Sequence, residues 1–160
     1  MKKKVKSWKD YHHQLYQVYH SIIALTLVPF AFFFLEWDSS FISPISMSNP
    51  FFILIAQSIW VVGYASWYVW RGENIKYQIT DSADVAYKMG EFKKRNIRKY
   101  LILGGAGIIS VAAMWLAPSF IFVIAYFAVL IQYSFLRPSE DKFVRDMRLS
   151  KEDRKTLHEE

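Results

Sequence analysis

Three of the four histidines in this 160-residue chain lie close together near its start, at His12, His13 and His20. Neutral imidazole is the commonest metal ligand in proteins, so these residues are the first candidates for metal or haem chemistry. His13 and His20 share a helix face, but seven residues of helix separate them by about 10 Å, whereas a zinc–nitrogen bond is about 2 Å long. One helix cannot bring both to one ion, so we expect no metal and no cofactor within one chain.

His20 suggests a second kind of chemistry, because it stands beside Tyr16, Gln17 and Tyr19. Histidine titrates near neutral pH, so these four residues are a candidate pocket for a quinone or a lipid head group, or a proton relay. The plainer interpretation is an interfacial histidine that hydrogen-bonds to head groups or to the backbone.

Two glutamines, Gln57 and Gln132, lie deep within long stretches that contain no Asp, Glu, Lys or Arg. Amides in membrane helices commonly hydrogen-bond one helix to another, which is the structural interpretation. The functional alternative is that they line a path between protomers together with Ser110. Coupled transporters usually place an ionisable group near the middle of the membrane, and these stretches offer none.

Small residues gather in the last apolar part of the chain, where they allow another helix backbone to approach closely. Gly63, in an earlier apolar stretch, is a candidate on the opposing helix. The predicted helix-packing surface consists of Gly104, Gly105, Ala106, Gly107, Ser110 and Ala113. These glycines do not form a phosphate loop, because no Lys-Ser/Thr pair follows them.

The elements that position these residues follow from the charge pattern. Residues 11–35, 39–70 and 100–136 contain no charged residue apart from histidine, whereas a soluble surface helix needs a polar face. A helix needs about 20 apolar residues to cross a membrane. We therefore predict an all-α integral membrane protein whose four transmembrane helices run up-down-up-down, with an external loop at 38–50; the spans are residues 16–37, 51–70, 100–117 and 119–136.

The basic residues predict the orientation of these helices. All 20 Lys and Arg fall within residues 1–15, 71–99 and 137–160. Positively charged flanks stay cytoplasmic, so both termini and the middle segment should lie inside the cell. The sequence thus predicts a multi-pass protein of the cell (inner) membrane whose basic segments meet anionic lipids at the cytoplasmic face, with no nucleic-acid partner.

The segment 71–99 carries an apolar stripe, because Val85, Met89 and Phe92 recur at spacings of four and three. Such a stripe can dock onto a partner or onto lipid. We take packing against this protein's own membrane face or its complex as the default. Residues 137–160 form a charged tail.

The sequence contains no motif that identifies a reaction. It has no cysteine, which excludes thiolate catalysis and Cys-ligated metals, and no Ser-His-Asp or paired-carboxylate arrangement. We therefore expect a non-catalytic accessory or scaffold subunit that binds other membrane protein subunits. The alternatives are a homo-oligomeric small pore or transporter, and a quinone- or lipid-headgroup-binding module that uses the His20 region.

Overall fold

The computed structural model describes residues 8–36, 49–74, 84–116, 119–150 and 153. The described part is helical without any strand, and its five helices are α1 (Trp8–Leu35), α2 (Asn49–Asn74), α3 (Val85–Leu116), α4 (Phe120–Phe135) and α5 (Glu140–Asp146). Most of the predicted external loop, residues 117–118 at the junction of the third and fourth predicted spans, and most of the last ten residues lie outside the described residues.

Three of these helices, α1, α2 and α3, are each long and apolar enough to cross a membrane. The fourth, α4, has 16 residues and is about 24 Å long at 1.5 Å per residue. It reaches a comparable length only together with α5, from which it is separated by a 78° bend. The predicted all-helical architecture is confirmed for the described residues, with three helices of membrane-spanning length and composition, or four when the bent pair counts as one.

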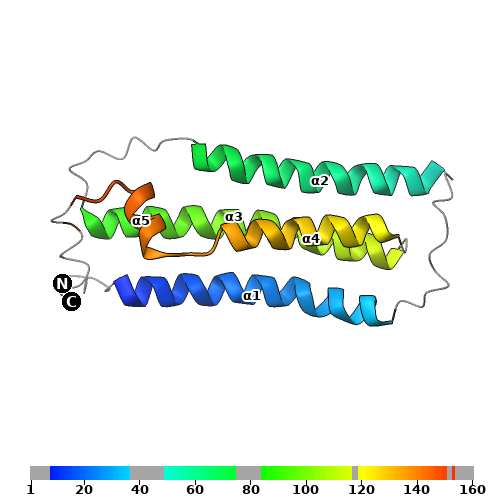
Figure 1. Cartoon of the computed structure of the whole chain (residues 1–160), viewed down its shortest axis with the longest axis horizontal. Coiled ribbons are helices and arrows are strands. Elements are labelled where there is room, and N and C mark those ends of the chain that lie inside the picture. The colour runs from blue at the N-terminus through cyan, green and yellow to red at the C-terminus, as the bar shows by residue number, and fades with distance from the viewer. Residues whose placement is uncertain (1–7, 37–48, 75–83, 117–118, 151–152, 154–160) are drawn as a thin grey trace.

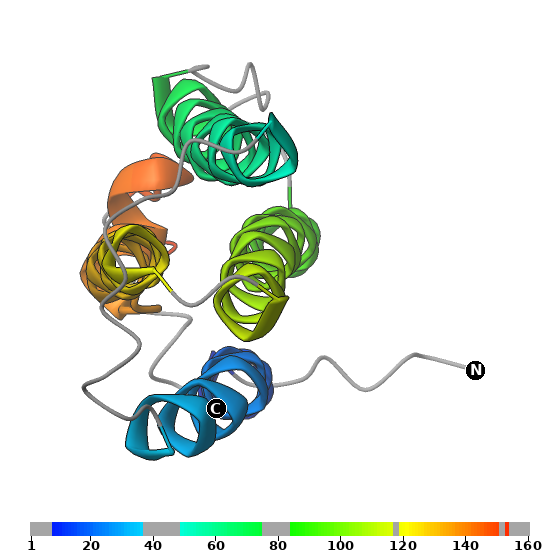
Figure 2. The same cartoon turned by 90° about the vertical axis from the view of Figure 1, so that its right-hand side faces the viewer.

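The helices α1 to α4 run in alternating directions, side by side (Figure 1). Helix α3 packs against α1, α2 and α4, and α2 also packs against α4. The end view places α3 and α4 between α1 and α2 (Figure 2). Because α3 has three neighbours, it is the most deeply buried of the long helices, and its position determines which faces of the others meet.

Helix α3 is longer than the sequence pattern predicts. We expect a short cytoplasmic helix within residues 71–99 and a separate span from residue 100, but one unbroken helix covers both. The basic run between Lys93 and Lys99 contains neither Gly nor Pro, so nothing ends the hydrogen-bond ladder there. The basic run is therefore rigidly joined to the apolar half of the same helix.

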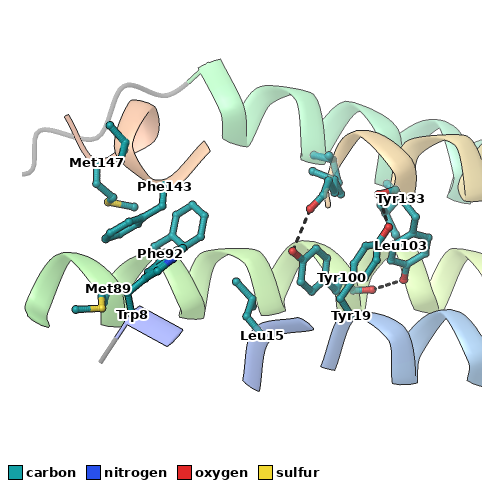
Figure 3. Close-up of a cluster of buried hydrophobic side chains, with 14 of the residues drawn as sticks. Trp8, Leu15, Tyr19, Met89, Phe92, Tyr100, Leu103, Tyr133, Phe143 and Met147 are labelled. Carbon is teal, nitrogen blue, oxygen red and sulfur yellow. Dashed lines mark hydrogen bonds between the residues drawn. The ribbon is translucent and has the colours of Figure 1, made fainter. Parts of the chain in front are cut away.

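An aromatic cluster covers the apolar stripe of α3. Met89 and Phe92 are 4% and 1% exposed, and Val85 packs against the same core. The Trp8 ring of α1 stacks on the Phe143 ring of α5 at 4.5 Å, and Phe92 meets Phe143 edge-on at 5.1 Å (Figure 3). The stripe is thus covered by α1 and α5.

Three buried tyrosines tie α1, α3 and α4 together through their hydroxyls (Figure 3). Tyr19 donates to the Tyr133 carbonyl at 3.0 Å, Tyr133 donates to the Tyr100 carbonyl at 2.7 Å, and Tyr100 donates to the Leu136 carbonyl at 3.0 Å. A buried hydroxyl without a partner would cost about 1–3 kcal/mol. Each hydroxyl is satisfied by a backbone carbonyl of α3 or of the α4 end, so the network fixes the positions of the three helices relative to one another along their axes.

The bend between α4 and α5 is held by side chains of α5, its cap residue and α1. The last carbonyls of a helix have no partner within it. Here the Phe135 carbonyl accepts from the Lys142 ammonium at 3.3 Å, while His12 of α1 lies 3.3 Å from the Pro138 carbonyl. Ser139 caps α5 by accepting from the Lys142 amide. These contacts place α5 beside the first half of α3.

Candidate functional site

The four residues around His20 differ in how far they are buried, with Tyr16 half-buried and Tyr19 buried. His20 is exposed, and its Nδ1 lies 2.9 Å from the Tyr16 carbonyl of the same helix. Gln17 contacts the His13 ring at 3.0 Å, also within α1. Tyr19 points the other way, into the buried tyrosine network. The cavities described below are lined by other residues.

The polar residues of the charge-free stretches also lie apart. Gln57 is exposed on α2, whereas Ser110 is buried and donates to the Ala106 carbonyl of its own helix. Gln132 donates to the Ser66 hydroxyl at 2.7 Å, which joins α4 to α2. Its Oε1 is buried and has no hydrogen-bond partner among the described residues. Within one chain these residues do not line a common path.

The small residues of α3 divide into two groups. A Cβ added at Gly104 would lie 2.6 Å from the Ile22 side chain, and one at Gly107 would lie 3.3 Å from Thr26, so these two glycines allow α1 to approach. Ala106, Ser110 and Ala113 are buried. A Cβ added at Gly105 or Gly63 would meet nothing within 4 Å. Those two glycines face open space.

The strongest concentration of chemical groups is a cleft between the second half of α2 and the first half of α3, with a volume of about 810 Å³. We call it the basic cleft. One carboxylate, that of Glu91, lines it. The cationic residues that line it are Arg71, Lys94, Arg95, Arg98 and Lys99. The excess of positive charge gives the cleft an electrostatic potential that would attract an anion.

The α2 wall of the basic cleft is aromatic. Tyr64, Trp67, Tyr68 and Arg71 line it, and the Arg71 guanidinium lies 4.9 Å from the centre of the Trp67 ring. This cation–π contact orients Arg71 while leaving its donors able to bind a ligand. Trp and Tyr are enriched at membrane–water interfaces, because one end of each ring system is apolar and the other is polar.

Local helix geometry explains why these side chains converge. Tyr64, Trp67, Tyr68 and Arg71 follow the spacing 0, 3, 4 and 7, which places them on one face of α2. On α3, Lys94 and Arg98 are four residues apart, as are Arg95 and Lys99. Like charges at this spacing repel by about 0.2–0.5 kcal/mol per pair. A bound anion relieves that repulsion.

The donors suit a phosphate group better than a simple ion. An arginine guanidinium offers a planar fork of N–H donors that can bind two phosphate oxygens at once, and lysine adds a compact point charge. Lys99 is only 3% exposed although it lines the cleft, so part of the charge sits where water screens it weakly. The described residues contain no group of three or more His, Asp or Glu that could hold a metal ion.

Comparison with protein-family models, with curated protein sequences and with solved structures finds no match to this chain. The function must therefore be argued from the site itself. The basic residues of 71–99 predict an orientation and a contact with anionic lipids, but the sequence alone does not show that they line a cleft with a face of α2. The signal that would have found the site is the aromatic face of α2 that ends at Arg71, read together with the basic run of α3.

Proposed function

We propose that this protein is a non-catalytic, multi-pass protein of the cell (inner) membrane that binds the head group of an anionic phospholipid in the basic cleft. Both termini lie in the cytoplasm in this proposal. The distribution of Lys and Arg supports that orientation, since it leaves the opposite side of the predicted spans without basic residues. Exposed apolar side chains such as Trp60, Leu101 and Phe135 would face lipid.

The observation that carries the proposal is the position of the basic cleft on α3. The cationic residues Lys94 to Lys99 run directly into a stretch that is free of charge from Tyr100 onwards, within one rigid helix. That change from charge to apolar surface is where a membrane surface would meet α3. Basic pockets between membrane helices on the cytoplasmic side suit phospholipid head groups. The cleft has the charge, the donors and the depth for a phosphodiester.

This proposal moves the head-group site away from His20, where the sequence suggests it, to the cleft between α2 and α3. The wider role remains the one expected from the sequence, an accessory or scaffold subunit of a larger membrane complex. A lipid in the basic cleft would fill the space between α2 and α3 and so hold α2 against the bundle. Gentle detergent purification followed by mass measurement tests the wider role, because a complex subunit would carry foreign subunits in fixed ratio.

The lipid proposal is tested by native mass spectrometry of the purified protein in neutral detergent, titrated with phosphatidylglycerol and, as an uncharged reference, phosphatidylcholine. The double variant Lys94→Gln/Arg98→Gln removes two exposed cations of the cleft. Charge-assisted hydrogen bonds contribute about 1.5–3 kcal/mol each, so we expect phosphatidylglycerol affinity to fall by about tenfold or more.

The matched control is Lys9→Gln/Arg145→Gln, which removes the same charge from exposed positions on α1 and α5 outside the cleft. It should retain the wild-type preference for phosphatidylglycerol. Equal losses in both double variants would show a general charge attraction in place of a site. Unchanged binding in the cleft variant would contradict the proposal outright.

A further inference from the structure

An apolar groove continues from the basic cleft along the same seam between α2 and α3. Its volume is about 430 Å³, and it shares Tyr64 and Leu101 with the cleft. Ala65 and Ala106, each 2% exposed, lie at its base, and Trp60 and Ile109 stand at its sides with 74% and 44% of their surface exposed. The groove thus begins where the charges end.

The absence of a side chain at Gly105 leaves part of this groove open. Gly105 lines it, and a Cβ added there would meet nothing within 4 Å. The open space beside Gly105 is therefore the groove itself. Gly63 of α2 has equally open surroundings but does not line the groove. The small side chains at Ala65 and Ala106 keep the base of the groove low.

The two helices present matching faces along this path. On α3, Arg98, Leu101, Gly105 and Ile109 follow helical spacing along one face, and Arg98 lies about 10 Å from Gly105 along the axis. Helix α2 runs in the opposite direction, so its face passes from Arg71 through Tyr64 to Trp60 in the same direction in space (Figure 1). Along this direction the α2 wall changes from cationic to aromatic, and the α3 wall changes from cationic to apolar.

We infer that the ligand is a whole long-chain anionic phospholipid, with its phosphate in the basic cleft and one acyl chain in the apolar groove over Gly105. This inference rests on the proposed function and specifies its ligand class. A soluble phosphate, a nucleotide or a free head group would use only the cleft. A single long-chain lipid uses both parts, because charge and apolar surface follow each other in the order that a phospholipid presents them.

Two comparisons distinguish a whole lipid from a soluble anion: lipids with short and long acyl chains, and variants with and without a side chain that fills the groove. Binding of dihexanoyl and dipalmitoyl phosphatidylglycerol, and of inorganic phosphate as the soluble anion, is measured by native mass spectrometry on the intact protein. Wild type should bind the long-chain lipid at least about tenfold more tightly than the short-chain one, because each buried methylene contributes about 0.8 kcal/mol. Gly105→Phe should abolish most of that difference, because it weakens long-chain binding more than short-chain binding.

Gly63→Phe is the matched control, since it adds the same side chain to a glycine in open surroundings outside the groove. It should keep the wild-type dependence on chain length. The inference is overturned if Gly105→Phe keeps that dependence, or if inorganic phosphate displaces the long-chain lipid at equal concentration. If wild type bound phosphatidylglycerol no better than phosphatidylcholine, the proposed function itself would be overturned. Failure of the inference and failure of the proposed function therefore give different results.

Discussion

The Tyr133 hydroxyl of α4 donates a 2.7 Å hydrogen bond to the Tyr100 carbonyl in the middle of α3. A carbonyl inside a helix can accept a second hydrogen bond only where the neighbouring side chains leave it accessible. Gly104 provides that access, because a Cβ there would lie 3.2 Å from the Tyr133 hydroxyl. The contact between α3 and α4 therefore depends on having glycine, with no side chain, at residue 104.

Gly104→Ala should destabilise the bundle, whereas Gly105→Ala should not. The added methyl at Gly104 would also lie 2.6 Å from Ile22, and overpacking of this kind costs about 1–3 kcal/mol. At Gly105 the added methyl meets open space, and the higher helix propensity of Ala stabilises the helix by up to about 1 kcal/mol. Thermal unfolding in detergent should therefore place the Gly104→Ala midpoint below that of Gly105→Ala. Equal midpoints would contradict this account of the helix contact.

Tyr100→Phe should lower the free energy of unfolding by about 1–3 kcal/mol, because it leaves the buried Leu136 carbonyl without the donor supplied by Tyr100. Tyr87→Phe is the control, since Tyr87 lies on the same helix and is 60% exposed. Denaturant titration compares the two variants. A loss of stability in Tyr87→Phe as large as that in Tyr100→Phe would argue against the tyrosine network.

The contact between Asp153 and Lys88 of α3 should contribute to stability in a pH-dependent way. Burial raises the pKa of the Asp153 carboxyl, but hydrogen bonds from Ser150 and the Lys88 ammonium at 3.3 Å outweigh that effect and hold the pKa below its ordinary value. A lowered folded-state pKa stabilises the folded state above the unfolded pKa of about 3.9, and this contribution is lost as the pH falls through the folded pKa. Asp153→Asn should therefore be less stable than wild type near neutral pH.

The difference between Asp153→Asn and wild type should persist from about pH 6 to about pH 4 and should shrink as the solution is acidified further. Thermal unfolding across both ranges measures it. Asp141→Asn, which changes an exposed carboxylate of α5, is the control and should follow the wild-type curve more closely. A difference from wild type that is independent of pH would show that the ion pair with Lys88 does not stabilise the folded state.

The proposed orientation can be tested with single cysteines, because the chain has none of its own. Arg145→Cys on α5 should react with an impermeant thiol reagent only from the cytoplasmic side. Glu36→Cys, just after the end of α1, should react only from the opposite side, since both positions are exposed. Labelling of both cysteines from the same side would exclude the alternating crossing of the membrane.

Local periodicity predicts much of this fold. The charge-free stretches identify the apolar helices, and the spacing of Met89 and Phe92 identifies a buried face, because both patterns depend only on nearby residues. The neighbouring residues Tyr19 and His20 show where this reasoning stops. Because they are adjacent, the sequence suggests one pocket for both. About 100° of helix rotation separates their side chains, so Tyr19 enters the core while His20 is exposed.

The basic cleft could not be predicted from local patterns, because it depends on which helix faces meet. Arg71 and Arg98 lie 27 positions apart in the sequence, and they line one cavity only because α2 and α3 pack antiparallel. The same limit applies to the glycines of α3. Gly104 and Gly105 are adjacent and chemically identical, yet one allows α1 and Tyr133 to approach while the other faces the apolar groove.

The central claim is that an anionic lipid head group occupies the basic cleft, and cross-linking from the head group tests it most directly. The intact protein is reconstituted with phosphatidylglycerol that carries a photoreactive group on its head group, and the labelled peptides are sequenced. We expect labels within residues 64–71 of α2 and 91–99 of α3, reduced in Lys94→Gln/Arg98→Gln. Labels concentrated on α1 around His20, or unchanged in that variant, would contradict the proposal.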